Sequence, residues 1–292
     1  MGVLGATSLV GRALLPVLAG ANRDVVAYSR KAHPSASMPN VQWRVLPPAG
    51  TGEQGSLRPA TDNIPYWICA APIWVLPDYF PMLEEHGAKR VVALSSTSRF
   101  TKSDSASDEE KVTAFNLSDA ETRLEQWAER RGINWIILRP TLIYGFGQDK
   151  NISELVPLIR RFRFFPLAGE SKGLRQPVHA DDVAAACLAA LEKLDVANRA
   201  YNLSGGETLT YREMISTIFT SLGLRPRLLV VPLKLLYVLQ TFLRLFPRYQ
   251  RWNTAMVARM NTDLVFDHSD AARDLNFTPR KFQLTLQDLP RK

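Results

Sequence analysis

The chain begins with the stretch MGVLGATSLVG, residues 1–11, and this stretch decides the fold. A short apolar run, Gly2–Leu4, precedes a glycine-rich segment and a helical pattern that ends near Gly20. Such a turn lets the backbone approach a pyrophosphate, and the N-terminus of the helix offers it free N–H groups. Ser8 stands where a GxxGxxG loop has its middle glycine, which excludes some backbone angles open only to glycine. The loop predicts a dinucleotide site, although a tight strand–helix turn without a ligand shows the same pattern.

The rest of the first half alternates apolar runs with helical segments. The expected strands are Val25–Ser29, Val41–Leu46, Tyr66–Ala70, Val91–Ser95 and Trp135–Arg139. They are continuous apolar runs, as in parallel strands that are covered on both faces. The best helix covers residues 108–131, with a capping box of Ser107 and Glu110 and a stop at Gly132. The pattern predicts an α/β fold, a doubly wound, Rossmann-like parallel sheet that binds ligands beyond the carboxyl ends of its strands.

The composition restricts the class of protein. Of the 292 residues, 46% are apolar and 22% are charged, which argues against a disordered or fibrous chain. Two cysteines, and four histidines without a tight cluster, predict no metal site and a reducing, intracellular compartment. The N-terminus shows no basic leader with an apolar stretch, so we expect a cytoplasmic location. The net charge of +8 favours anionic partners.

The second expected strand ends in Ser29, Arg30 and Lys31. A site for NAD(H) usually carries a carboxylate at this point for the ribose 2′-hydroxyl, whereas a 2′-phosphate calls for arginine or lysine. Arg12, at the start of the first helix, adds another cation. The sequence therefore favours NADP(H) over NAD(H), with a solvated basic loop as the alternative.

Later segments, together with the loop at residues 5–11, carry a resemblance to a known family. They are VVALSS (91–96), LRPTLIYG (138–145), PVHADDVA (177–184) and YNLSGGE (201–207). In this order they resemble the extended short-chain dehydrogenase/reductase superfamily, in its NAD-dependent epimerase/dehydratase branch. The resemblance spans nearly the whole chain. It implies an oxidoreductase that binds NAD(P) and acts on a nucleotide-sugar or a similar small carbonyl or alcohol substrate.

The resemblance also implies a division of the chain and a set of cofactor contacts. Residues 1–150 would form a dinucleotide-binding domain to which residues 176–204 return, and residues 151–175 and 205–292 would form a smaller substrate-binding cap. The expected cofactor-binding residues are Gly5, Thr7, Ser8, Leu9, Val10, Gly11, Ser29, Arg30, Ala70, Ser95, Pro140 and Thr141.

One departure from the family concerns catalysis. The superfamily places a YxxxK pair on the helix after the fifth strand, where an alignment through Ser118 and Glu121 puts Phe115 and Asp119. Phenylalanine cannot transfer a proton, and aspartate carries the wrong sign to lower the pKa of a phenol. Ser96 and Tyr144 are therefore the candidate catalytic residues. The alternative is a catalytically silent NADP(H)-binding protein that acts as a redox sensor, a regulator or an assembly subunit.

Basic residues gather in two parts of the second half. Between Arg225 and Thr262 there are seven basic residues and no acidic one, and Leu233–Phe246 within this stretch is mostly apolar. This segment is too polar for a confident membrane span. It predicts a peripheral contact with an anionic membrane, or else burial of its apolar face against the cap or in a homodimer. Arginines and phenylalanines also alternate over residues 160–165, which suits either a diphosphate site or a helix end with its aromatic rings in the core. No nucleic-acid-binding module is recognised.

Overall fold

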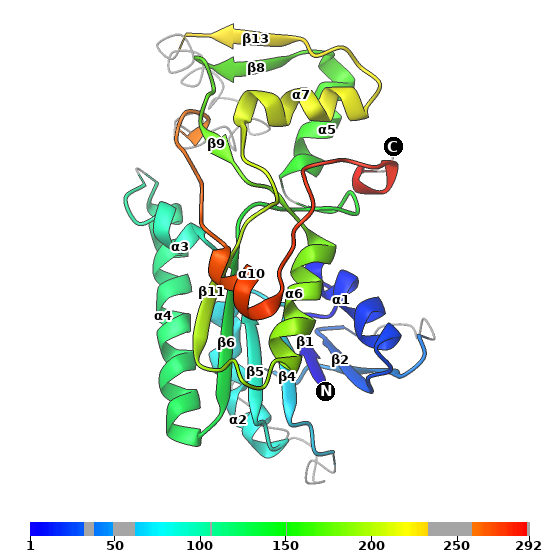
Figure 1. The fold of residues 1–292 in the computed structure, drawn as a ribbon, viewed down its shortest axis with the longest axis vertical. Helices are drawn as coiled ribbons and strands as arrows, with labels where there is room; N and C mark the ends of the chain where they lie inside the picture. The colour runs from blue at the N-terminus through cyan, green and yellow to red at the C-terminus, as the bar shows by residue number, and fades with distance from the viewer. Residues whose placement is uncertain (32–37, 49–61, 106, 150, 233–258, 291–292) are drawn as a thin grey trace.

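The computed structural model describes residues 1–31, 38–48, 62–105, 107–149, 151–232 and 259–290 (Figure 1). A seven-stranded parallel sheet has the order β11-β6-β5-β4-β1-β2-β3. Its strands are β1 (Gly2–Leu4), β2 (Val25–Ser29), β3 (Val41–Val45), β4 (Tyr66–Cys69), β5 (Arg90–Leu94), β6 (Asn134–Pro140) and β11 (Arg199–Leu203). Every strand expected from the sequence forms, and no end differs by more than one residue.

The strand order reverses between β1 and β4. From β1 the chain builds outwards through β2 and β3, and it then returns to place β4, β5, β6 and β11 on the other side. The predicted doubly wound α/β sheet is confirmed. In such sheets the crevice beyond the carboxyl ends of the strands, at the point of reversal, is where ligands bind.

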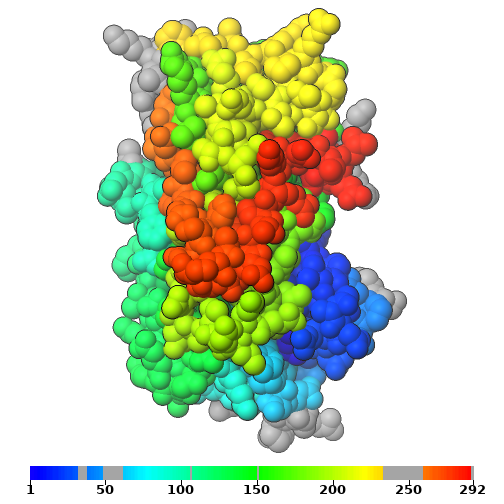
Figure 2. All heavy atoms as spheres, viewed as in Figure 1, coloured from blue at the N-terminus to red at the C-terminus, as the bar shows by residue number. Residues whose placement is uncertain are grey.

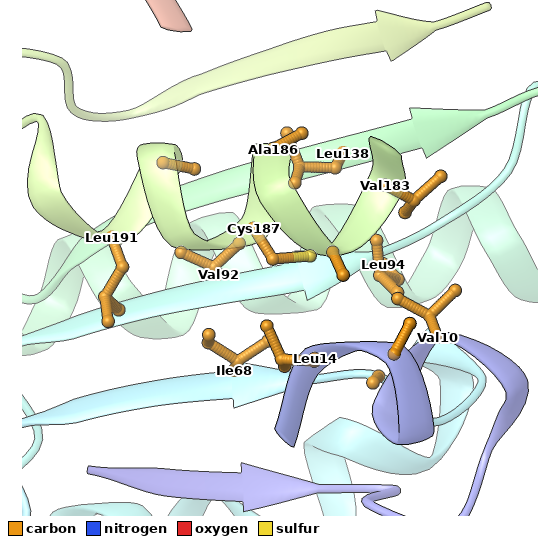
Figure 3. Packing of buried hydrophobic residues seen from close by; sticks show 14 of the residues in the cluster. Val10, Leu14, Ile68, Val92, Leu94, Leu138, Val183, Ala186, Cys187 and Leu191 are labelled. Carbon is orange, nitrogen blue, oxygen red and sulfur yellow. The ribbon is translucent and has the colours of Figure 1, made fainter. Parts of the chain in front are cut away.

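Helices cover both faces of the sheet. Residues of α1 (Leu9–Gly20), α6 (Ala180–Glu192) and α10 (Ser269–Leu275) share one core cluster with the strands, and η2 (Ile73–Tyr79), α2 (Phe80–Glu85) and α4 (Asp108–Arg131) share another. Figure 3 shows the first cluster, with Leu14 of α1 and Cys187 of α6 packed over Ile68 and Val92 of the sheet. Burial on both faces explains why the strands are continuous apolar runs.

Helix α4 begins and ends where the sequence predicted. Gly132 follows it in the left-handed conformation, with φ of 64°, which confirms the expected stop. The predicted capping box is wrong, because the Ser107 side chain makes no cap hydrogen bond. Glu110 instead accepts a hydrogen bond from Ser105 Oγ at 2.6 Å and forms an ion pair with Arg259. A distant segment therefore determines how this glutamate is used.

A third core cluster lies at the end of the molecule remote from α2 (Figure 1). Its main elements are α5 (Ile152–Phe162), β8 (Phe165–Ala168), α7 (Tyr211–Ser221) and β13 (Leu228–Val231). Short strands connect it to the sheet domain: β7 (Ile143–Tyr144) pairs with β10 (Val178–His179), and β9 (Leu174–Arg175) pairs with β12 (Leu209–Thr210).

The aromatic rings at residues 160–165 are divided between core and surface. Phe165 is 1% exposed, whereas Phe162 and Phe164 are 44% and 43% exposed. The alternative that all these rings lie in the core is therefore wrong for two of them. The cause is local, because α5 ends at Phe162 and Arg163 takes the left-handed conformation, so that the chain changes direction before β8.

His179, in the PVHADDVA segment, fastens the C-terminal part of the chain. Its Nδ1 accepts a hydrogen bond from the Asp181 backbone N–H at 3.1 Å, and its Nε2 lies 3.0 Å from Asp288 Oδ1, in η4 (Leu286–Asp288). Burial acts to raise the pKa of Asp288, but the hydrogen bonds from His179 and Thr285 hold it well below its usual range. Gly145 has φ of 131°, and a Cβ there would lie 2.8 Å from His179 Nε2. These contacts give this histidine a structural role.

The basic stretch found in the sequence is only partly described. Leu233–Phe246, the apolar part, lies outside the described residues. Among the helices in the ranges given above, none is both long enough and apolar enough to cross a membrane.

We predict that Asp288→Asn lowers the free energy of unfolding by about 2 kcal/mol near pH 7, because charge-assisted hydrogen bonds from His179 and Thr285 are lost. The pKa of Asp288 is lowered by folding, so its contribution is complete above the ordinary aspartate pKa, about 4, and declines as the pH falls further. Urea denaturation between pH 7 and pH 3 measures the difference. If the difference in unfolding free energy between parent and variant stayed constant with pH, the stabilising role of the Asp288 carboxylate would be contradicted. Asp119→Asn, at an exposed site, is the control.

Candidate functional site

A cleft of about 860 Å³ lies beyond the carboxyl ends of β1, β4, β5 and β6. It is lined at one end by the turn after β1 and at the other by the third core cluster. Lining residues include Ser8, Leu9, Val10, Ala70, Ser95, Ser96, Thr97, Lys102, Pro140, Thr141, Arg175, Gln176, Tyr211, Arg259 and Phe266. The cleft is thus located at the reversal of strand order, where the sheet topology predicts a ligand.

The turn after β1 is closely packed. Gly5 has φ of 75°, and a Cβ there would lie 2.4 Å from the Ala71 backbone nitrogen. A Cβ on Gly11 would lie 2.3 Å from the Gly5 carbonyl oxygen. Ser8 is the N-cap of α1, and its hydroxyl accepts a hydrogen bond from the Gly11 N–H at 3.0 Å. The serine that departs from the glycine pattern therefore closes the first turn of the helix, and its neighbours Leu9 and Val10 line the cleft.

The predicted cofactor residues fall into two groups. Those that line the cleft are Ser8, Leu9, Val10, Ala70, Ser95, Pro140 and Thr141. Gly5 and Gly11 shape the turn behind it, and Thr7 is exposed beside them. Ser29 is buried and donates a hydrogen bond to the Lys31 carbonyl, whereas Arg30 is exposed just beyond the end of β2. Because β2 is next to β1 in the sheet, Arg30 lies on the side of the turn where an adenosine ribose would extend.

A buried carboxylate joins the structural elements on the far wall of the cleft. Glu121 of α4 is 1% exposed and accepts hydrogen bonds from Ser95 Oγ, Arg99 Nη1 and Arg139 Nε, the last at 3.1 Å. Burial lowers the pKa of both arginines, and the charge of Arg139 lowers that of Arg99 further. The cluster joins the ends of β5 and β6 to α3 (Ser98–Thr101) and α4.

The two candidate catalytic residues have different environments. Ser96 is partly exposed, lines the cleft and accepts a hydrogen bond from the Ser98 N–H at 3.1 Å. Tyr144 is 0% exposed and packs edge-on against His179 and Phe282, with centroid distances of 5.0 Å to each. Burial raises the pKa of Tyr144 to about 12, and its side chain is not part of the cleft wall. Its position in the core contradicts the expectation that it replaces the missing acid.

The structure corrects the expected register of α4. Phe115 is 69% exposed, and Asp119 forms a surface ion pair with Arg123 at 3.8 Å. Neither residue faces the cleft, so these positions do not correspond to the YxxxK pair. The inward face carries Glu110, Ala114, Leu117, Ala120, Glu121 and Leu124. Since α4 contains no tyrosine at any position, the absence of the usual phenol holds in every register.

Three cationic side chains at the cap end of the cleft were not among the site residues expected from the sequence; they are Lys102, Arg175 and Arg259. Lys102 lines the cleft, and its pKa is lowered by burial, an effect that Glu110 opposes and Arg259 strengthens. Arg175 is 4% exposed and donates hydrogen bonds to the carbonyls of Leu174 and Thr262, each at 2.7 Å, while burial lowers its pKa to about 10. Arg175 lies two residues before the PVHADDVA segment, and this position was the feature of the sequence that could have identified it as a site residue.

Potential metal ligands and thiols were also located. In the residues that the structure describes, no group of three histidine, cysteine, aspartate or glutamate side chains is placed to hold a metal ion. Cys69 and Cys187 are free and buried, and burial raises the pKa of each to about 12. These thiols belong to the packing of the core.

We predict that Glu121→Ala lowers the free energy of unfolding by about 3–5 kcal/mol, because two largely buried guanidinium groups lose their carboxylate. Asp119→Ala, two residues earlier on the same helix, removes only an exposed ion pair and should change it by less than about 0.5 kcal/mol. Urea denaturation followed by circular dichroism measures both. Equal effects of the two substitutions would contradict the role assigned to Glu121.

Comparisons with known proteins agree with this geometry. Residues 80–204 match the model of the NAD dependent epimerase/dehydratase family. The uncharacterized protein y4nG of Sinorhizobium fredii is 28% identical over 52% of this chain and 38% of its own length. The mitochondrial NADH dehydrogenase [ubiquinone] 1 alpha subcomplex subunit 9 of Arabidopsis thaliana is 26% identical over 50% of this chain and 39% of its own. UDP-glucose 4-epimerase of Vibrio cholerae is 24% identical over 60% of this chain and 50% of its own length. The chain spans half or less of the length of these curated relatives.

Solved structures share the fold over almost the whole chain. MoeE5 in complex with UDP-glucose and NAD has a TM-score of 0.65 and 22% identity, and the match covers 98% of this chain and 94% of that one. UDP-glucuronic acid 4-epimerase of Bacillus cereus in complex with NAD has a TM-score of 0.70 and 16% identity, with coverages of 99% and 95%. Residues 80–204 are thus similar to the NAD dependent epimerase/dehydratase family, and the solved structures show that the whole chain shares the fold of such proteins.

Proposed function

We propose that this chain binds a nicotinamide dinucleotide and a nucleotide-sugar in one cleft and acts as an epimerase/dehydratase-like oxidoreductase. The observation that carries the proposal is the continuity of the cleft, which runs from the turn after β1, through Ser96 and Thr141, to Lys102 and Arg259. A bound nicotinamide supplies the acceptor or donor of a hydride. Residues 151–175 and 205–232 then serve as the substrate-binding cap, and residues 1–150 with 176–204 as the dinucleotide-binding domain. Within the expected cap segment 205–292, α10 packs on the sheet and so belongs to the dinucleotide-binding domain.

The turn after β1 fits a dinucleotide. It has no room for side chains at Gly5 and Gly11, because the first packs on the backbone at Ala71 and the second on the Gly5 carbonyl, and this close packing of strand, turn and helix is what the glycines of a dinucleotide-binding turn provide. The N-terminus of α1 opens into the cleft through Leu9 and Val10 and contributes the positive end of its dipole. Pro140 and Thr141 would border the nicotinamide, and Arg30 would meet a 2′-phosphate, which favours NADP(H).

The opposite end of the cleft fits an anionic substrate. The side-chain ammonium of Lys102 makes no hydrogen bond or ion pair with the described residues, so it is available to a phosphate. Arg259 is oriented by Glu110, and Arg175 holds the backbone from which Arg259 extends. Charge-assisted hydrogen bonds from such side chains suit the diphosphate of a nucleotide-sugar. MoeE5 has been solved with UDP-glucose and with UDP-glucuronic acid, which supports this substrate class.

Proton transfer is the step at which this chain departs from its family. Ser96 is the partly exposed hydroxyl at the end of β5 within the cleft, and we assign it the positioning of the reacting hydroxyl or carbonyl group. A serine hydroxyl is a weak acid by itself, and α4 supplies no tyrosine. This absence favours a second candidate function, a catalytically silent NADP(H)-binding protein that acts as a sensor, regulator or assembly subunit. The similarity to NADH dehydrogenase [ubiquinone] 1 alpha subcomplex subunit 9, which its name describes as a subunit, supports the assembly role.

The cofactor preference yields a direct prediction. Fluorescence titration should show tighter binding of NADPH than of NADH. Arg30→Glu should weaken NADPH binding about tenfold or more, because a charge-assisted hydrogen bond to the 2′-phosphate is replaced by repulsion, and should leave NADH binding nearly unchanged. Arg23→Glu, at the other end of β2, is the control. Equal affinities of the parent protein for both cofactors would refute the preference.

The cap end of the cleft is tested with UDP-glucose. In calorimetric titrations of the protein loaded with cofactor, Lys102→Met should weaken UDP-glucose binding about tenfold or more, since a charged contact to phosphate is lost. Lys89→Met, an exposed lysine before β5, should bind as the parent does. Unchanged binding in Lys102→Met would exclude this lysine from the substrate site.

The same complexes decide between the two candidate functions. The proposed oxidoreductase should alter the sugar of UDP-glucose, as followed by proton NMR and by absorbance of the reduced nicotinamide, and Ser96→Ala should slow that change. Binding of both ligands with no change in either would favour the silent protein.

A further inference from the structure

The surface at the end of α5 and along β13 combines exposed apolar side chains with arginines. We call it the arginine–aromatic patch and define it as Arg161, Phe162, Arg163, Phe164, Arg225, Arg227, Leu229 and Val230. Its apolar members are between 43% and 56% exposed. The patch lies at the end of the molecule farthest from α2 (Figure 1), and the space-filling view shows the yellow residues of this end in Figure 2. None of its residues lines the cleft.

The apolar part of the patch is held in place by the fold. Strand β13 pairs in parallel with β8, with Leu228 opposite Phe165, and those two residues turn inwards. Leu229 and Val230 remain on the outside. Phe164 and Leu229 border a shallow hollow of about 290 Å³ together with Arg227 and Leu228. Phe162 and Phe164 lie beside each other, with ring centroids 6.2 Å apart.

The charged part of the patch is not neutralised. The segments 155–169 and 221–232, which form it, contain five arginines and no aspartate or glutamate. Arg160 donates a hydrogen bond to the Pro290 carbonyl, and Arg161 lies over the ring of Phe162 at 5.4 Å. Within the ranges that the structure describes, Arg161, Arg163, Arg225 and Arg227 make no ion pair.

We propose that the arginine–aromatic patch docks this protein on the surface of an anionic lipid membrane. An anionic bilayer supplies negative charge to the arginines and an apolar layer within reach of short exposed aromatic and aliphatic side chains. Phenylalanine and leucine on one face with arginine around them is the composition of interfacial membrane contacts. A second copy of the chain is a poorer occupant, because four unpaired arginines would face the same four across a twofold interface.

Vesicle flotation of the full chain tests the docking. The protein should float with vesicles of phosphatidylcholine mixed with phosphatidylglycerol, remain below with phosphatidylcholine alone, and be released by high salt. Arg225→Gln with Arg227→Gln should lower the partition coefficient about 30-fold at low salt, the effect of removing two interfacial cations. Phe162→Ser with Phe164→Ser should lower binding as well.

Matched controls come from the same chain. Val112→Ser with Phe115→Ser removes exposed apolar side chains from α4, and Arg23→Gln with Arg131→Gln removes exposed arginines from the sheet domain. Both should float like the parent protein, and every variant should keep its NADPH affinity if it is folded. The proposal is overturned if the parent fails to float, or if patch and control variants lose binding equally. It is also overturned if light scattering shows that the parent protein is a dimer, and that the Phe162→Ser, Phe164→Ser variant is a monomer with unchanged vesicle binding.

Discussion

The wall of the cleft depends on one buried carboxylate. Glu121 receives hydrogen bonds from Ser95, Arg99 and Arg139, which come from the ends of β5 and β6 and from α3. A buried carboxylate between two guanidinium groups is tolerated only while its partners remain in position. The interaction therefore fixes the carboxyl edge of the sheet, the start of the segment that leads to Lys102, and the inward face of α4 at the same time. The shape of the candidate site follows from this arrangement.

Under the proposed function, the two ends of the cleft would recognise their ligands by different means. At the turn after β1 the backbone is closely packed at Gly5 and Gly11, and the start of α1, with Ser8, Leu9 and Val10, lines the cleft. At the cap end, Lys102 and Arg259 present charge on long side chains. A rigid backbone site suits a pyrophosphate of constant shape, whereas charged side chains suit the phosphates of substrates that vary in their sugar.

The sheet and the turn were predictable because their determinants are local. Continuous apolar runs, the glycine spacing and the terminal Gly132 each act within a few residues, and the structure confirms the elements they predict. The side chains that line the cap end were not predictable in this way. Lys102 and Arg259 become neighbours only through the return of the chain after α7, and Glu110 pairs with Arg259 instead of capping its own helix. The sequence offered Tyr144 as a candidate catalytic phenol, but packing against Phe282, near the C-terminus, buries it.

The correction to α4 changes how the missing catalytic pair is understood. With Phe115 and Asp119 on the solvent side, a tyrosine and a lysine introduced there would not reach the cleft. The inward face at that height carries Leu117 and Glu121, and Glu121 already binds the Ser95 hydroxyl. Of the serines that end β5, Ser96 alone therefore keeps a hydroxyl not bound to Glu121. Besides Ser96, the titratable side chains that line the cleft include Lys102, Asp149 and Glu154, and under the proposed function these are the groups within the cleft that could exchange a proton with a substrate. Burial lowers the pKa of Lys102, which brings this lysine closer to the range in which a side chain can both hold and release a proton.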